Sequence, residues 1–288
     1  MNFIPVNKPL ITKADIDKVN KTLKSGWISS SGKEIVAFEK NFSKYVNHKF
    51  GIAVANGSAA LDIAIKLANL KKNDEIINPN FTIISNALPG IKQGLKIKVV
   101  DCDMYDWNLN IEKLKKTITK KTKVIIATHI YNYPCRVDII KRICDQKNIL
   151  LIEDCAEAIG QKIFSKKCGS FGHISVFSFY ANKQITTGEG GMITTNSKLF
   201  EKKARSLRNL SFGVKNRFNH TDVAWNYRLT NIQASLGLSQ LQRVNTIIKK
   251  RHRVGKLYYE KLKSNKNIFM PSPKNKFSKN IYWVIAIL

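Results

Sequence analysis

Residues 149–160 read ILLIEDCAEAIG, and residues 177–195 read FSFYANKQITTGEGGMITT. The first stretch is a short apolar run that ends in an acidic pair, which is typical of a buried strand with polar side chains at its carboxyl end. The second stretch begins as an apolar run, continues through Lys183 into a glycine-rich turn and ends in another apolar run. Together they predict strands of one sheet with chemically active side chains where the strands end.

The same alternation extends outward on the N-terminal side. Apolar runs of four to eight residues alternate with amphipathic stretches such as SAALDIAIKLANL (58–70) and VDIIKRICDQKN (137–148). This pattern indicates an α/β protein whose mainly parallel strands are joined by crossover helices. The remaining strands are expected at FGIAVA (50–55), EIINP (75–79), KIKVVDCD (96–103), KVIIATHI (123–130) and ISVFSFY (174–180).

The C-terminal part is expected to start a second, smaller domain. Residues 231–262 have the pattern of one long helix with a possible break near Gly237, and residues 281–288, IYWVIAIL, read as a strand at the end of the chain. We therefore expect a large domain over residues 1–245, including an N-terminal arm, and an incomplete small domain over residues 246–288.

Composition favours a compact cytoplasmic protein. Of the 288 residues, 43% are hydrophobic, which is enough for a sizeable core, and no apolar run has the length of a membrane span or the form of a signal peptide. The cysteines are scattered without a paired motif, so we expect reduced thiols and no metal site. They are Cys102, Cys135, Cys144, Cys155 and Cys168.

The net charge of +29 raises nucleic-acid binding as a possible function. However, the lysines are spread along the whole chain, and the densest clusters, 113–123 and 249–253, contain no interleaved aromatic residues for base stacking. We expect neither a specific nucleic-acid partner nor a membrane partner. A basic surface would still attract anionic small molecules.

Lys183 and Asp154 are the strongest candidates for chemistry. A lysine that forms imines must be partly neutral, so it needs a dry or cationic setting, and the alternative is an ordinary surface lysine. An acid at the end of a buried strand can hold the proton of a cofactor's pyridine ring, and the alternative is a helix N-cap.

A third signal is VANGSAALDIAIKLA (54–68), in which Asn-Gly-Ser joins a strand to a helix of small residues. Backbone N–H groups at such a helix start, with the hydroxyl of Ser58, can bind a phosphate. Taken alone, an ordinary capped helix explains the pattern equally well.

The order of these three signals resembles the sugar aminotransferases of the DegT/DnrJ/EryC1/StrS family, which have the aspartate-aminotransferase (type I) fold of enzymes that depend on pyridoxal 5′-phosphate (PLP). GEGG after the lysine is the most specific match. The matching segments follow the family's order through most of the chain: GWISSSGKEIVAFE (26–39), TKVIIATHIYNYPCRVD (122–138), EDCAEAIG (153–160), GSFG (169–172), SFYANKQITTGEGG (178–191) and WNYRLTNIQASLGLSQL (225–241).

The resemblance implies PLP as cofactor and assigns the catalytic residues. Lys183 would carry the cofactor covalently and move protons to and from the sugar carbon. Asp154 would pair with the pyridine nitrogen, and Glu157 would lie near the ring hydroxyl.

For the cofactor's phosphate, the resemblance implies the amides of Gly57, Ser58 and Ala59 together with the hydroxyl of Ser178. Asn226 matches the family asparagine that reaches the phosphate from the neighbouring subunit. The family resemblance therefore predicts a homodimer with shared active sites.

The implied reaction moves an amino group, with glutamate as the usual donor, to a nucleotide-linked 4-keto-6-deoxy sugar for surface polysaccharide (O-antigen) biosynthesis. The GWISS, PC and NKQITTGEGG details resemble enzymes that aminate C4 of GDP-4-keto-6-deoxymannose. One departure is Ile83, with Phe81 nearby, where the family often has an aromatic residue over the cofactor. Together with departures at Arg136, His173 and Ala224, this change leaves the identity of the sugar open.

Two alternatives remain at this stage. A related PLP-dependent sugar 3-dehydratase carries histidine in place of the lysine, so Lys183 argues against it. A non-catalytic family member or a binding module would be consistent with the incomplete small domain and the changed positions.

Overall fold

The structure is a computed structural model that describes residue 3, residues 5–131 and residues 133–288. Its centre is a seven-stranded sheet in the order β1-β9-β8-β5-β4-β2-β3. Four of the six strand pairings are parallel, and β9 runs antiparallel to both β1 and β8. The strands are β1 (Phe50–Val54), β2 (Glu75–Pro79), β3 (Lys96–Val100), β4 (Thr122–Thr128), β5 (Leu150–Asp154), β8 (Ile174–Ser178) and β9 (Gly191–Thr195).

Helices cover both faces of this sheet, and each face has its own apolar core. Strands buried on both faces need apolar side chains on both, which is why β5 and β8 read as continuous apolar runs in the sequence. One face is covered by α2 (Lys33–Val46), α5 (Ile111–Thr117), α6 (Val137–Lys147), α8 (Asn231–Gln242) and α9 (Val244–Leu262). The other is covered by α3 (Gly57–Leu67), α4 (Leu88–Lys92) and α7 (Lys198–Arg208).

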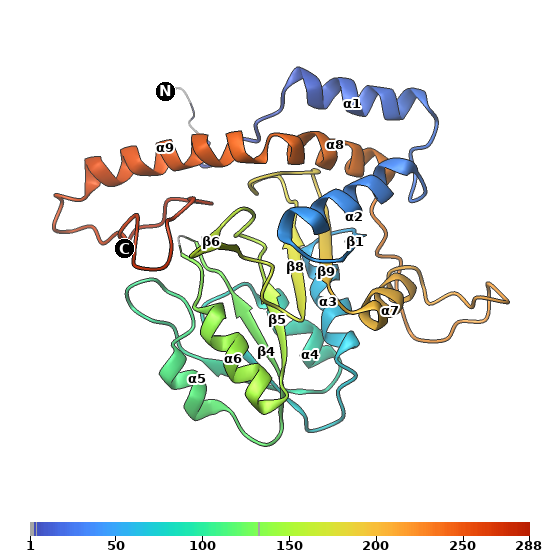
Figure 1. Cartoon of the computed structure of the whole chain (residues 1–288), viewed down its shortest axis with the longest axis horizontal. Coiled ribbons are helices and arrows are strands. Elements are labelled where there is room, and N and C mark those ends of the chain that lie inside the picture. The colour runs from blue at the N-terminus through green and yellow to red at the C-terminus, as the bar shows by residue number, and fades with distance from the viewer. Residues whose placement is uncertain (1–2, 4, 132) are drawn as a thin grey trace.

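The remaining elements lie at the periphery. Helix α1 (Lys13–Lys24) packs on α8, and α8 and α9 run end to end across the upper part of the molecule, below α1, in Figure 1. The short elements are η1 (Ile84–Asn86), β6 (Lys162–Ile163) and β7 (Lys166–Lys167). Among the described residues, no helix combines the length and the apolarity that crossing a bilayer requires.

The α/β fold and its mainly parallel sheet are confirmed, but two local predictions are wrong. The long helical segment divides at Arg243, between α8 and α9, and not at Gly237. Gly237 lies inside α8, where a Cβ would come within 2.6 Å of the ring of Phe38. This glycine permits close packing between α8 and α2 instead of ending a helix.

The expected strand at residues 281–288 is also absent from the described structure. Tyr282 has a φ of 53°, which is outside the extended region, and its ring packs on Gly255 of α9. A strand needs a neighbouring strand to bond its backbone groups, whereas this segment follows the surface of a helix. Its last residue exchanges two backbone hydrogen bonds with Phe269 only.

Candidate active site

A cavity of about 480 Å³ lies at the carboxyl ends of β1, β4, β5 and β8, where ligands collect in open α/β sheets. All three sequence signals meet there, because the topology brings the start of α3, the end of β5 and the turn after β8 to one place. The lining includes Asn56, Gly57, Ser58, Ile83, Ser85, Thr128, Asp154, Glu157, Ser178, Lys183 and Trp283.

Asp154 ends β5 and is buried in the wall of this cavity. Its Oδ1 atom accepts a hydrogen bond of 3.1 Å from the backbone N–H of Ala156, whereas its Oδ2 atom is buried without a partner in the described structure. Burial raises the pKa of Asp154, although the nearby charge of Lys183 opposes this rise. A buried carboxylate oxygen without a donor is suited to accept a hydrogen bond from a cationic N–H group.

Lys183 lies in the turn between β8 and β9 and lines the same cavity. Burial lowers the pKa of Lys183, while the carboxylates of Glu157 and Asp154 act in the opposite direction. The structure therefore supplies the dry setting that a nucleophilic lysine needs.

Glu157 follows β5 and contacts the lysine turn. Its Oε2 atom accepts a hydrogen bond of 2.8 Å from the N–H of Tyr131, and its carbonyl accepts one of 2.6 Å from Gln184 Nε2. Burial raises the pKa of Glu157 to about 7. This carboxyl group can hold or release a proton near neutral pH.

The start of α3 provides a place for a phosphate. A Cβ at Gly57 would lie 3.1 Å from the Cβ of Ser178, so the absence of a side chain keeps this corner open. The hydroxyl of Ser58 lies 2.9 Å from that of Ser85, which the sequence did not single out. The amide of Ala59, by contrast, already donates to the N-cap oxygen of Asn56 at 2.8 Å.

Together these features fit PLP. The free oxygen of Asp154 suits a protonated pyridine nitrogen, the glycine corner at the start of α3 suits a phosphate, and the desolvated Lys183 suits an aldehyde.

Asn226 lies apart from these residues and does not line the cavity of its own chain. It lies on the exposed loop between α7 and α8, where its Oδ1 atom accepts a hydrogen bond of 2.9 Å from Arg228 Nε. The structure thus brings most of the predicted site residues together around the cavity, but neither Asn226 nor Ala59 belongs to its lining.

Trp283 is the main site residue that sequence reasoning missed. Its ring centroid lies 3.8 Å from the Nζ atom of Lys183. The only signal was an aromatic residue in the last apolar run, which also fits a core strand. Thr128, at the end of β4, was missed as well; its hydroxyl accepts a hydrogen bond of 2.6 Å from Asn86 in the wall of the site.

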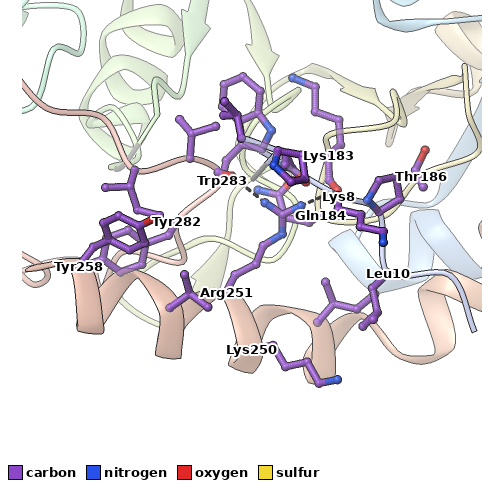
Figure 2. Close-up of a pocket in the computed structure, with 18 of the residues that line it drawn as sticks. Lys8, Leu10, Lys183, Gln184, Thr186, Lys250, Arg251, Tyr258, Tyr282 and Trp283 are labelled. Carbon is purple, nitrogen blue, oxygen red and sulfur yellow. Dashed lines mark hydrogen bonds between the residues drawn. The ribbon is translucent and has the colours of Figure 1, made fainter. Parts of the chain in front are cut away.

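A second cavity, of about 620 Å³, also borders Lys183, and Figure 2 shows residues that line it. Its walls come from the N-terminal arm, α9 and the C-terminal segment, including Lys8, Leu10, Arg251 and Tyr258. Lys183 and Trp283 line both cavities, so they form the partition between them.

Behind β5, the side chains of His129, Glu153 and Cys168 lie close enough to suggest a metal site. The carboxylate of Glu153, however, already accepts hydrogen bonds from the N–H groups of Gly169 and Gly172, at 2.6 and 2.8 Å, and lies 3.0 Å from His129 Nε2. These hydrogen bonds stabilise the buried negative charge of Glu153 without a metal ion. The cluster is therefore explained as an anchor that fixes the GSFG turn to β5.

Comparison with known proteins gives one consistent result. The model of the DegT/DnrJ/EryC1/StrS aminotransferase family matches residues 9–288. GDP-perosamine synthase of Escherichia coli O157:H7 is 36% identical over 291 residues, covering 100% of this chain and 78% of the relative. GDP-perosamine synthase of Caulobacter vibrioides is 38% identical, covering 99% of this chain and 76% of the relative.

The solved structures agree with the sequence comparison. Helicobacter pylori PseC, an aminotransferase involved in the biosynthesis of pseudoaminic acid, superimposes with a TM-score of 0.92 at 26% identity. The alignment covers 100% of this chain and 78% of that one. The family resemblance and the fold expected from it are both confirmed.

Proposed function

The chain belongs to the DegT/DnrJ/EryC1/StrS aminotransferase family, and on this premise we propose that it aminates C4 of GDP-4-keto-6-deoxymannose to give GDP-perosamine. The relatives named for this product match nearly the whole chain. The observation that carries the proposal is the desolvated Lys183 in one cavity with the unpartnered oxygen of Asp154.

When bound, PLP would supply two things, an electron sink and a carrier for the amino group between donor and acceptor. Lys183 would hold the cofactor and, once free as an amine, would deliver a proton to the sugar carbon that is aminated, because this carbon gains a C–H bond in the reaction. It can take up the proton that it delivers because burial keeps its pKa below that of a free lysine.

Asp154 would hold the proton on the ring nitrogen through its free Oδ2 atom, which would keep the ring electron-poor. Glu157 would share a proton with the ring hydroxyl, since its pKa is about 7. Gly57, Ser58 and Ser178 would hold the phosphate at the start of α3. Ala59 would contribute its amide only by giving up its bond to Asn56.

Several further parts of the proposal concern assembly and context. Glutamate is the amino donor, the enzyme acts in the cytoplasm, and its product serves surface polysaccharide biosynthesis. The chain forms a homodimer in which Asn226 reaches the partner's phosphate, which is consistent with its exposed position outside its own cavity. Residues 1–245 form the cofactor-binding domain, and a smaller domain begins at residue 246.

The two alternatives are less well supported. The presence of Lys183 opposes a dehydratase that uses histidine at this position. A non-catalytic member would not need a desolvated lysine facing a buried acid, so the arrangement of the cavity favours an enzyme.

The test is to incubate the protein with PLP, glutamate and a panel of 4-keto sugar nucleotides, and to measure 2-oxoglutarate and the amino sugar by mass spectrometry. We expect both products with the GDP-linked sugar, and neither with a Lys183→Ala variant. Borohydride should fix the cofactor to Lys183 in the unmodified chain. Fixation of the cofactor without amination of any sugar would contradict the proposed substrate class.

A further inference from the structure

Lys183 stands between two cavities, and the partition beside it is the side chain of Trp283. We propose that Trp283 is a positioning residue: its indole face holds the amino group of Lys183 in place, and its chain segment closes the cofactor cavity on that side. The inference rests on the proposed role of Lys183 as the cofactor lysine.

The indole contacts the lysine in two ways. The Nζ atom lies 3.8 Å from the ring centroid, well within the range of a cation–π interaction. The indole Nε1–H donates a hydrogen bond of 3.1 Å to the carbonyl of Asn182, the residue before Lys183. This hydrogen bond therefore fixes the position of the indole ring relative to the backbone of the lysine turn.

The position of the ring is also fixed from outside the lysine turn. It stacks on Tyr131 with centroids 5.9 Å apart and an interplanar angle of 25°. The N–H of Tyr131 in turn donates to Glu157 in the cofactor cavity. Trp283 is thus packed between Lys183 and Tyr131, whose N–H group binds Glu157.

Arg251 of α9 ties the two chain segments together (Figure 2). Its guanidinium donates to the carbonyl of Trp283 at 2.6 Å and to those of Asn182 and Lys183 at 3.1 and 3.0 Å. Its positive charge also opposes protonation of Lys183. One side chain therefore holds the lysine turn and the C-terminal segment in a single arrangement.

The C-terminal segment packs on α9 at Gly255, one turn further along this helix. A Cβ at this position would lie 2.2 Å from the ring of Tyr282, the neighbour of Trp283. The aromatic ring is rigid, so a methyl group at Gly255 has to displace the segment. A substitution at Gly255 can therefore displace the C-terminal segment that closes the cavity without changing any residue that lines the cofactor cavity.

The contact has a definite electrostatic effect. Burial disfavours the charged form of the lysine, whereas the face of an aromatic ring stabilises it. A substitution that keeps the apolar cover but removes the ring face should therefore lower the pKa of Lys183. A merely structural role for Trp283 does not predict such a shift.

The experiment measures the rate at which an amine-reactive reagent labels Lys183 as a function of pH, with mass spectrometry as the readout. It uses the full chain without added cofactor or sugar, and the exposed Lys166 serves as an internal reference. In Trp283→Leu, the midpoint of the Lys183 profile should fall by about 0.5 to 1.5 pH units, and in Trp283→Phe by less. Phe164→Leu changes an exposed aromatic residue that takes part in none of the described ring contacts, and it should leave the profile unchanged.

Gly255→Ala tests the closing role of the C-terminal segment separately from the contact between Lys183 and the indole ring. It should raise the labelling rate of Lys183 at high pH, because the displaced segment exposes the amine. An unchanged midpoint in both Trp283 variants, or an equal shift in Phe164→Leu, overturns the inference. Since the labelling needs neither sugar nor turnover, a chain that aminates sugars but shows no midpoint shift overturns this inference alone. A chain that shows the shift but aminates no sugar contradicts only the proposed function.

Discussion

Gly57 lies directly against Ser178, so that a Cβ at position 57 would lie 3.1 Å from the Cβ of Ser178. We predict that Gly57→Ala weakens PLP binding by about tenfold or more, because the methyl group enters the corner proposed for the phosphate. Equilibrium dialysis or titration of the cofactor's absorbance band measures this. Gly94→Ala is the control: it adds strain at a φ of 67° but faces open space, so it should lower stability and leave cofactor affinity intact.

Asp154→Asn should lower kcat by about one to two decades, because the ring nitrogen loses a charge-assisted hydrogen bond of roughly 1.5–3 kcal/mol. The fold should survive, since the free Oδ2 atom has no protein partner to lose. Asp101→Asn is a matched control, since this acid also follows a strand of the sheet, the edge strand β3, but is exposed. An unchanged kcat in Asp154→Asn would refute the assigned role.

Glu157 should make the cofactor-free protein less stable as the pH rises. Burial raises its pKa from 4.5 to about 7, so the folded state binds a proton that the unfolded state releases. This contribution to stability is complete below about pH 4.5 and is lost as the pH rises to about 7, at a cost of at most about 3.5 kcal/mol.

Urea unfolding at a series of pH values compares the chain with Glu157→Gln. The difference between the two stabilities should change over that window. If the free energies of unfolding of the chain and of Glu157→Gln change with pH in the same way, the pKa of Glu157 is not raised and the prediction is wrong.

Lys183→Ala and Asn226→Ala should each be impaired alone and should partly restore activity when mixed. If sites are shared, a mixed dimer places both lesions in one site and leaves the other intact, so up to half of the sites in such a dimer are functional. Tagged subunits confirm that exchange has occurred. No recovery after proven exchange would mean that Asn226 acts within its own subunit.

Much of the fold could be read from local sequence. The predicted strands at 75–79 and 149–154 appear as β2 and β5 almost residue for residue, because the apolar residues at the centre of each are buried in the sheet. The position of Asp154 at a strand end and of Lys183 in the turn after β8 follow from the same runs. These features depend only on residues close together in the sequence, so the sequence alone predicts them.

Other features could not be obtained in this way. The amide of Ala59 was expected to face a phosphate, yet the side chain of Asn56 accepts its hydrogen bond, because a capping side chain competes for the same donor. The apolar run at 281–288 was expected to be a strand, yet no partner strand receives it in the described structure, and Tyr282 packs on Gly255 instead.

The sequence by itself determined the α/β class, the family and the residues that meet at the carboxyl ends of the strands, because each depends on local runs or on a specific motif. Only the tertiary structure decided what surrounds Lys183. Trp283 and Arg251 are distant from it in the chain and contact it because α9 and the C-terminal segment fold back over the lysine turn. Such contacts are set by the packing of whole elements against one another, and no local pattern encodes them.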